Sequence, residues 1–321
     1  MLPRLNFAHL PTPLEALPRL SAALRGPQIW VKRDDQTGLA FGGNKTRKLE
    51  FLIADAQAAG AETLITTGAV QSNHCRQTAA AASRFGFNCI LVLAGEKVLD
   101  PTGNYFLDRF LGAEIVWAGE SGREQALERT FQSALENRKK PYLIPYGGSN
   151  ELGAASYVFA LQELLDQKAD LDWIVFPSSS GGTQAGLVVG GQKFSFQGRI
   201  LGISIENPAP ILQESVAKLA GETARILGDH TKFLPDEILV NDNYLGAGYG
   251  VMGEPEAEAI NLLARQEGLL LDPVYTGRAA AGLIDLIRSG FFTADQNVLF
   301  WHTGGTPALF AHPYLEMLLA G

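Results

Sequence analysis

Residues 62–85, ETLITTGAVQSNHCRQTAAAASRF, decide the fold class because they join a strand pattern to a helix pattern. Residues 62–67 are rich in β-branched and apolar side chains, and residues 71–85 have the 3.6-residue periodicity of a helix. Further strand patterns are predicted at residues 89–94, 114–118, 142–145, 173–176, 200–206, 238–240 and 298–301, and helix patterns at residues 123–137, 151–166, 254–267 and 277–288. This alternation predicts an α/β protein with mostly parallel twisted sheets and helices on both faces.

The composition is that of a globular chain, since 46% of the 321 residues are hydrophobic and 19% are charged. The formal net charge of −8 argues against a broad nucleic-acid surface. Two cysteines, Cys75 and Cys89, exclude a disulfide framework and indicate a reducing compartment. Neither a signal peptide nor an apolar run of membrane-spanning length is visible. We therefore expect a cytoplasmic protein without a nucleic-acid or membrane partner.

Open α/β sheets bind ligands where strand ends lead into helices, so the polar residues after each strand are the candidate site. In FGGNKTRKLE, residues 41–50, two glycines precede Asn44 and Lys45 at the start of a helix pattern. The field of a helix N-terminus, together with burial, favours the neutral and nucleophilic form of a lysine. This position suits Schiff-base chemistry, although the segment taken alone also fits a solvated cationic helix face.

After the strand at residues 62–67, Ser72 and Asn73 lie where a helix begins. Both are good N-caps, and both are also candidates for contact with a ligand. We interpret His74 and Cys75 as packing residues; the alternative for His74 is that it stacks on a planar group. No second His or Cys follows at the spacing of metal ligands, so no metal site is expected.

The segment PSSSGGTQAG, residues 177–186, leads from a strand pattern into a helix pattern. Small residues at a helix N-terminus expose consecutive N–H groups, and the helix dipole favours an anion, so the segment predicts a phosphate cradle. Its spacing matches neither the P-loop nor the dinucleotide-binding fingerprint. A nucleotide-binding oxidoreductase is therefore a much weaker hypothesis than a phosphate-binding enzyme of another class.

Three more side chains complete the candidate set. Tyr249 in GAGYG and Tyr275 in LDPVYTGR are either active-site acids or half-buried core residues. Thr303 in VLFWHTGGTP follows a buried strand pattern and can donate to a ligand nitrogen. A lysine nucleophile, a phosphate cradle without Mg²⁺ ligands and polar groups for a ring together predict pyridoxal 5'-phosphate as the cofactor.

The chain resembles the D-cysteine desulfhydrase and 1-aminocyclopropane-1-carboxylate deaminase family, pyridoxal-phosphate enzymes of fold type II. The resemblance runs from about Pro11 to Phe310 and rests on GGNKTRKLEFL, GAVQSNHCRQTAAAA, SSSGGTQAGL, GYGV, DPVYTGRAAAGLI and HTGGTPALF, in the family's order. It implies a large cofactor-binding domain at residues 1–47 and 158–321, with a small domain inserted at residues 48–157. It also implies a homodimer.

The resemblance further implies a role for each matching residue. Lys45 is the Schiff-base lysine, Asn44 precedes it, and Asn73 holds the ring hydroxyl of the cofactor. Ser72, Tyr249 and Tyr275 face the substrate, Gly181, Gly182 and Thr183 bind the phosphate, and Thr303 contacts the pyridine nitrogen.

Two threonines favour elimination over opening of a cyclopropane ring. Where this chain has Tyr275–Thr276–Gly277, the matching motif of ring-opening members of the family is Tyr-Glu-Gly. These members also have Leu in place of Thr303. A carboxylate beside the ring nitrogen keeps it protonated and strengthens the electron sink, and a hydroxyl does not. Elimination of a good leaving group needs less stabilisation of the carbanion.

The expected reaction is therefore β-elimination of D-cysteine to pyruvate, sulfide and ammonia, with Lys45 as the general base at Cα. Alternatives within the family are an L-cysteate sulfo-lyase, with sulfite as the leaving group, and, behind it, 1-aminocyclopropane-1-carboxylate deaminase. A different class is a non-catalytic pyridoxal-phosphate-binding protein, which the presence of Lys45, Ser72 and Tyr275 disfavours.

Overall fold

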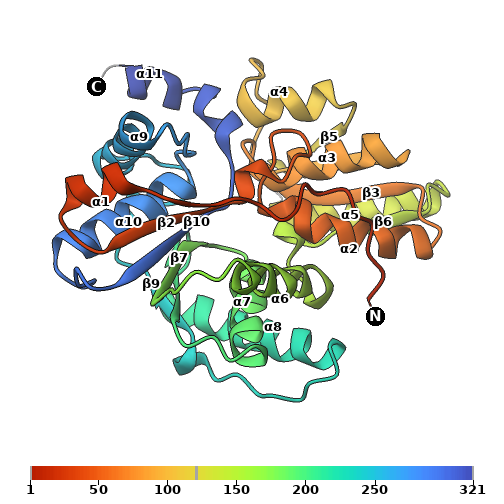
Figure 1. Ribbon diagram of the computed structural model, residues 1–321. Coiled ribbons are helices and arrows are strands. Elements are labelled where there is room, and N and C mark those ends of the chain that lie inside the picture. The colour runs from red at the N-terminus through yellow and green to blue at the C-terminus, as the bar shows by residue number, and fades with distance from the viewer. Residues whose placement is uncertain (1, 120–121, 320–321) are drawn as a thin grey trace.

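The computed structural model describes residues 2–119 and 122–319 and contains two sheets (Figure 1). The larger sheet has six strands in the order β1-β2-β10-β7-β8-β9. Its neighbouring strands are parallel, except that β1 pairs antiparallel with β2 at the edge. The strands are β1 (Leu14–Ala16), β2 (Gln28–Arg33), β7 (Trp173–Ser178), β8 (Arg199–Ser204), β9 (Leu239–Asn241) and β10 (Asn297–His302).

The smaller sheet has four parallel strands in the order β5-β4-β3-β6 and lies to the right in Figure 1. They are β3 (Thr63–Gly68), β4 (Asn88–Leu93), β5 (Glu114–Trp117) and β6 (Pro141–Leu143). All eight strands predicted from the sequence are present, with ends shifted by one or two residues. The sequence patterns did not reveal β1 or β2.

Helices cover both faces of each sheet, which confirms the predicted α/β class. They are α1 (Pro18–Leu24), α2 (Asn44–Ala58), α3 (Asn73–Phe85), α4 (Gly103–Phe110), α5 (Arg123–Glu136), α6 (Glu151–Asp166), α7 (Gly182–Lys193), α8 (Ala209–Ile226), α9 (Glu254–Glu267), α10 (Thr276–Arg288) and α11 (Tyr314–Leu319). Short 3₁₀ segments are η1 (Asp34–Gln36), η3 (Tyr146–Gly148), η4 (Pro235–Glu237) and η5 (Thr306–Phe310).

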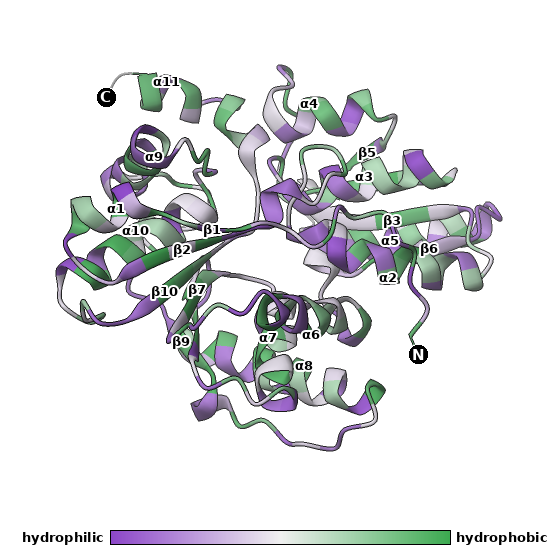
Figure 2. Ribbon diagram, in the orientation of Figure 1, coloured by the Kyte–Doolittle hydropathy of each residue, from purple (hydrophilic) through white to green (hydrophobic). Residues whose placement is uncertain are grey.

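Strand β10 shows how the sequence supports these layers. Its side chains alternate across the sheet: Val298 and Phe300 pack in the cluster that contains α9 and α10 residues, whereas Leu299 and Trp301 pack with residues of α6 and α7. All four are fully buried, and Figure 2 colours β10 mainly as hydrophobic. A parallel strand that is buried on both faces has a continuous run of apolar residues, and residues 298–301 show this pattern.

The four strands of the smaller sheet all fall inside residues 48–157, the segment predicted as an inserted domain. Both predicted boundaries lie within helices, α2 and α6, and these two helices pack against each other. The boundaries themselves stay a prediction. Within the described residues, no helix is both long and apolar enough to cross a membrane.

Candidate active site

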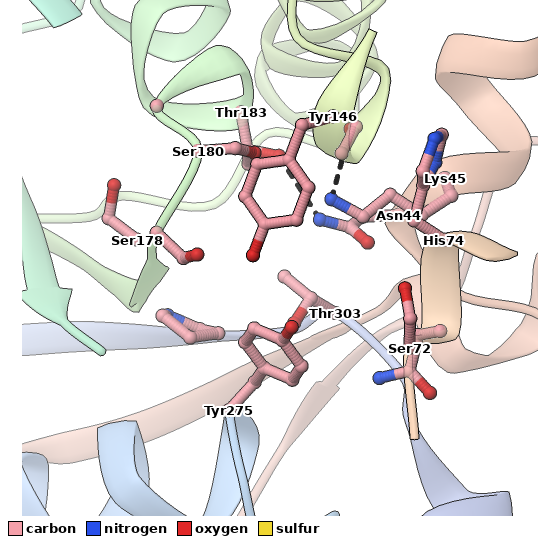
Figure 3. Close-up of a pocket in the computed structure, with 15 residues that line it drawn as sticks. Asn44, Lys45, Ser72, His74, Tyr146, Ser178, Ser180, Thr183, Tyr275 and Thr303 are labelled. Atoms are coloured by element: carbon pink, nitrogen blue, oxygen red, sulfur yellow. Dashed lines mark hydrogen bonds between the residues drawn. The ribbon is translucent and has the colours of Figure 1, made fainter. Parts of the chain in front are cut away.

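A pocket lies where loops from the two sheets meet (Figure 3). Its wall combines the first residues of α2 and α3 with η3, the β7–α7 loop, the start of α10 and the segment after β10. The lining residues are Asn44, Lys45, Ser72, Asn73, His74, Tyr146, Gly147, Pro177, Ser178, Ser179, Ser180, Gly181, Thr183, Tyr275 and Thr303. Loops at the carboxyl ends of parallel strands therefore form the site, as expected for this class of sheet.

Lys45 brings the one amine among these lining residues. Its Nζ donates to the carbonyl oxygen of Gly147 at 3.1 Å, and Lys48 Nζ donates to the same oxygen at 3.1 Å. Burial lowers the pKa of Lys45 to about 8, an effect that the Glu206 carboxylate opposes. A lysine with this pKa is partly neutral near pH 7.5, the form that attacks a carbonyl carbon or accepts a proton.

Gly147 also shapes the pocket through its backbone. Its φ is +66°, in the left-handed region, and a Cβ there would lie 2.3 Å from Ser180 Oγ and 3.4 Å from Lys45 Nζ. Glycine therefore lets η3 approach both the lysine and the serine loop.

The loop between β7 and α7 forms an anion cradle. Gly181 is the N-cap of α7, with a φ of +80°. Because it is a glycine, no capping side chain covers the N-terminus of the helix. Ser178 Oγ is buried without a hydrogen-bond partner among the described residues, so a ligand oxygen in the pocket would satisfy it. The N–H of Gly182 donates to Ser149 Oγ at 3.2 Å, and Gly182 itself does not line the pocket. An orphaned hydroxyl beside a helix N-terminus that begins with glycines fits a phosphate group.

Thr183 connects this cradle to the lysine helix. Its Oγ1 accepts a hydrogen bond from Asn44 Nδ2 at 3.1 Å (Figure 3). The backbone N–H of Asn44 in turn donates to the carbonyl of Thr303 at 2.9 Å. The three residues lie around the same pocket because these bonds hold α2, α7 and the end of β10 together.

Ser72 fulfils both interpretations that its sequence position allows. It is the N-cap of α3, since its Oγ accepts from the Cys75 N–H at 3.2 Å, and it also lines the pocket. The side-chain oxygen of Asn73 accepts from Asn104 Nδ2 at 2.9 Å. Within the described residues its NH₂ group donates to no acceptor, which leaves it for a ligand oxygen.

Tyr275 lines the pocket, and Tyr249 lies behind it. The two hydroxyl oxygens are 2.6 Å apart, and the rings meet at 74°. Burial raises the pKa of both hydroxyls well above the ordinary value. The neighbouring Tyr249 raises the pKa of Tyr275 further, whereas the hydrogen bond with Tyr275 opposes the upward shift of the Tyr249 pKa. Both hydroxyls are therefore protonated at neutral pH; one of them donates in the bond between the pair, and the other is available as a donor.

The two threonines of the reaction argument have different surroundings. Thr303 lines the pocket. Thr276 does not: its Oγ1 donates to Asp272 Oδ1 at 2.7 Å and accepts from the Asp272 N–H at 2.7 Å. Thr276 is therefore not among the lining residues, and its hydroxyl is used at the start of α10.

Three lining residues are not among the site residues expected from the sequence: His74, Tyr146 and Gly147. His74 packs as expected, with 3% of its surface exposed and Nε2 2.9 Å from Thr66 Oγ1, yet it also lines the pocket. Tyr146 lies three residues after the end of β6, and an aromatic residue between a strand end and two glycines is the signal that could have revealed it. Cys75 packs in the core of the smaller sheet, as expected. Among the described residues, no group of three or more His, Cys, Asp or Glu side chains could hold a metal ion.

Comparison with known proteins identifies the family. A sequence profile described as "Pyridoxal-phosphate dependent enzyme" matches residues 5–304. A crystal structure of an ACC deaminase homologue is 36% identical, with a TM-score of 0.91, and the match covers 99% of this chain and 96% of that one.

Two more distant structures show the fold alone. Threonine deaminase isoform 2 from Solanum lycopersicum, in its processed form, is 16% identical, with a TM-score of 0.68 and coverage of 96% and 82%. A pyridoxal 5'-phosphate-dependent aspartate racemase is 19% identical, with a TM-score of 0.64 and coverage of 92% and 90%. The buried lysine, the anion cradle and these matches lead to one conclusion: the chain belongs to the pyridoxal-phosphate-dependent enzyme family, has the type II fold, and uses pyridoxal 5'-phosphate as its cofactor.

Proposed function

We propose that the protein catalyses the β-elimination of D-cysteine. The Cα–H and Cβ–S bonds break, sulfur leaves as sulfide, and the aminoacrylate that is released hydrolyses to pyruvate and ammonia. One water molecule is consumed, so D-cysteine and water balance against pyruvate, sulfide and ammonia. The assignment of the substrate and its D configuration draws on the sequence resemblance, and the pocket supports the reaction type.

The residues of the pocket suit the cofactor. Ser178, Gly181 and the N-terminus of α7 would hold its phosphate, the NH₂ of Asn73 its ring oxygen, and Thr303 its ring nitrogen. When bound, pyridoxal phosphate supplies an aldehyde for the amine and a conjugated ring that takes up the electron pair from Cα.

Lys45 is the proposed general base. Once the substrate amine has replaced it, its amine is free to accept the Cα proton, and burial has already lowered its pKa to about 8. The hydroxyl of Ser72 and the N-terminus of α3 lie on another wall of the same pocket, where they suit the carboxylate of the substrate.

Tyr275 is the proposed proton donor to the leaving sulfur. Its hydroxyl faces the pocket, and the raised pKa keeps it protonated until charge develops on the sulfur. Tyr249 then stabilises the resulting phenolate through the hydrogen bond of 2.6 Å.

One observation carries the choice of elimination over ring opening. Among the lining residues there is no Asp or Glu, and Thr303 offers a hydroxyl after β10. Without a carboxylate partner the ring nitrogen is not held protonated, which suits departure of a good leaving group better than ring opening. We further propose that the enzyme is cytoplasmic and acts as a homodimer on a small amino acid.

The test is a turnover assay with purified holoenzyme and D-cysteine, in which sulfide and pyruvate are measured together. Equal amounts of both are expected. Lys45→Ala should lose turnover together with the visible absorption band of the lysine-bound cofactor. Production of neither sulfide nor pyruvate by the wild type would refute the proposal, as would a Lys45→Ala variant that retains turnover.

A further inference from the structure

Glu206 lies just after β8 and places a carboxylate beside the pocket. Its Oε1 accepts a hydrogen bond from Ser179 Oγ at 2.5 Å and lies 3.5 Å from the Tyr146 hydroxyl. Ser179 and Tyr146 both line the pocket, and Figure 3 shows the Tyr146 hydroxyl directed into it. The carboxylate is therefore one side chain away from a bound substrate.

The charge of Glu206 is not balanced by an ion pair. Among the residues that the structure describes, no Lys, Arg or His forms a salt bridge with it, and both of its contacts are neutral hydroxyls. One cation close to Tyr146 is Arg123, whose guanidinium carbon lies 4.2 Å from the centre of the Tyr146 ring. Arg123 therefore stacks on the tyrosine and leaves the carboxylate unpaired.

The carboxylate acts on the groups of the proposed reaction. Burial dominates the pKa values of Lys45, Tyr249 and Tyr275, and in each case the Glu206 charge adds an upward contribution. Arg123 acts on the pKa of Tyr146 instead, where it opposes burial and Glu206. Glu206 thus places a negative charge on the tyrosine side of the pocket, next to Tyr146 and Ser179.

We propose that Glu206 determines substrate specificity: with Tyr146 and Ser179 it forms an acidic corner that admits neutral or cationic side chains and rejects anionic ones. The inference rests on the proposed function, because it assumes an amino acid whose side chain points to the tyrosines. The acidic corner would favour substrates with a thiol on Cβ over substrates with a sulfonate or a carboxylate there.

The expected size follows from Coulomb's law. Two unit charges roughly 7 Å apart at an effective dielectric constant near 20 would change a binding constant by about fiftyfold, and solvent near a half-buried carboxylate reduces this to about tenfold. The discrimination should therefore be measurable by direct titration.

The test compares amino acids that lack a β-leaving group, so that binding is read without elimination. Both enantiomers of alanine, aspartate and 2,4-diaminobutyrate are titrated into the holoenzyme, and dissociation constants are taken from the change in cofactor absorption. Glu206→Gln removes the charge and keeps an oxygen that can accept from Ser179. Glu214→Gln, an exposed carboxylate on α8, is the matched control for net charge.

The wild type should bind alanine more tightly than aspartate, and Glu206→Gln should improve aspartate relative to alanine by about tenfold while weakening diaminobutyrate. Glu214→Gln should change neither ratio.

If Glu206→Gln fails to retain cofactor, Glu206→Ala replaces it with the same expectation. Ratios that equal the wild-type values, or no aspartate binding to any variant, would overturn the inference. A loss of cofactor affinity with unchanged ratios would indicate a purely structural role. If D-cysteine releases no sulfide while the ratios still change, the proposed reaction fails and the acidic corner stands.

Discussion

Replacing Lys45 by methionine should stabilise the cofactor-free protein at neutral pH. The side chain is buried, and burial lowers its pKa from 10.5 to about 8, so the folded state carries a desolvated ammonium group below that pH. Methionine has a similar shape and no charge. The carbonyl of Gly147, which loses Lys45 as a donor, keeps its hydrogen bond from Lys48.

The magnitude follows from the pKa difference. A shift of 2.5 units, from 10.5 to about 8, corresponds to about 3 kcal/mol. The sign follows from proton binding: between pH 8 and 10.5 the unfolded chain keeps this proton when the folded protein has lost it, so stability rises with pH. The cost is fully present below pH 8 and disappears above pH 10.5.

Urea denaturation at pH 7 and pH 10, followed by tryptophan fluorescence, measures this effect. Lys45→Met should exceed the wild type by about 3 kcal/mol at pH 7 and by less than about 1 kcal/mol at pH 10. The difference between the two proteins cancels the titration of the buried tyrosines. Lys218→Met, at an exposed lysine on α8, should show no such change with pH. A Lys45→Met protein that is less stable than the wild type at pH 7, or an equal difference at both pH values, would refute the reasoning.

Other predictions concern the second tyrosine, the buried ion pairs and assembly. Tyr249→Phe removes the 2.6 Å bond to Tyr275 and should lower kcat about fivefold with little change in KM, so steady-state kinetics with an unchanged kcat would count against this role. Arg47→Met leaves the fully buried Asp34 carboxylate without its partner at 2.8 Å and should cost about 3–5 kcal/mol in urea denaturation, whereas a loss below about 1 kcal/mol would show that the pair is dispensable. Light scattering should give about twice the chain mass of 34.5 kDa, and a monomeric mass would contradict the proposed homodimer.

The fold could be predicted where strands are buried on both faces. Residues 298–301 form a continuous apolar run, and β10 follows it closely. Strand β2 was missed because Lys32 lies inside QIWVKR. The structure buries this lysine completely, with its Nζ 2.6 Å from Glu163, a partner 131 residues away that no local pattern can reveal. Strand β1 has only three residues and pairs at the edge, so its signal is too short to distinguish.

The site could be predicted where a motif combines a glycine turn with a reactive residue. Lys45 and the loop that contains Gly181 have such motifs, and the structure brings both to one pocket. Tyr146 and Glu206 have none, because each gains its role only when η3 and the end of β8 meet across the two sheets. Thr276 shows the opposite case: its motif position suggested the pocket, and a hydrogen bond to its own helix start turned the hydroxyl inward.

The most direct test of the account is the identity of the 2-oxo acid. Holoenzyme is given D-cysteine, L-cysteate and 1-aminocyclopropane-1-carboxylate in parallel, and the product and kcat/KM are determined for each. The account predicts pyruvate with sulfide from D-cysteine at the highest kcat/KM. Pyruvate with sulfite from L-cysteate at a higher kcat/KM would contradict the acidic corner at Glu206, and 2-oxobutyrate from the cyclopropane substrate would contradict the argument from Thr303.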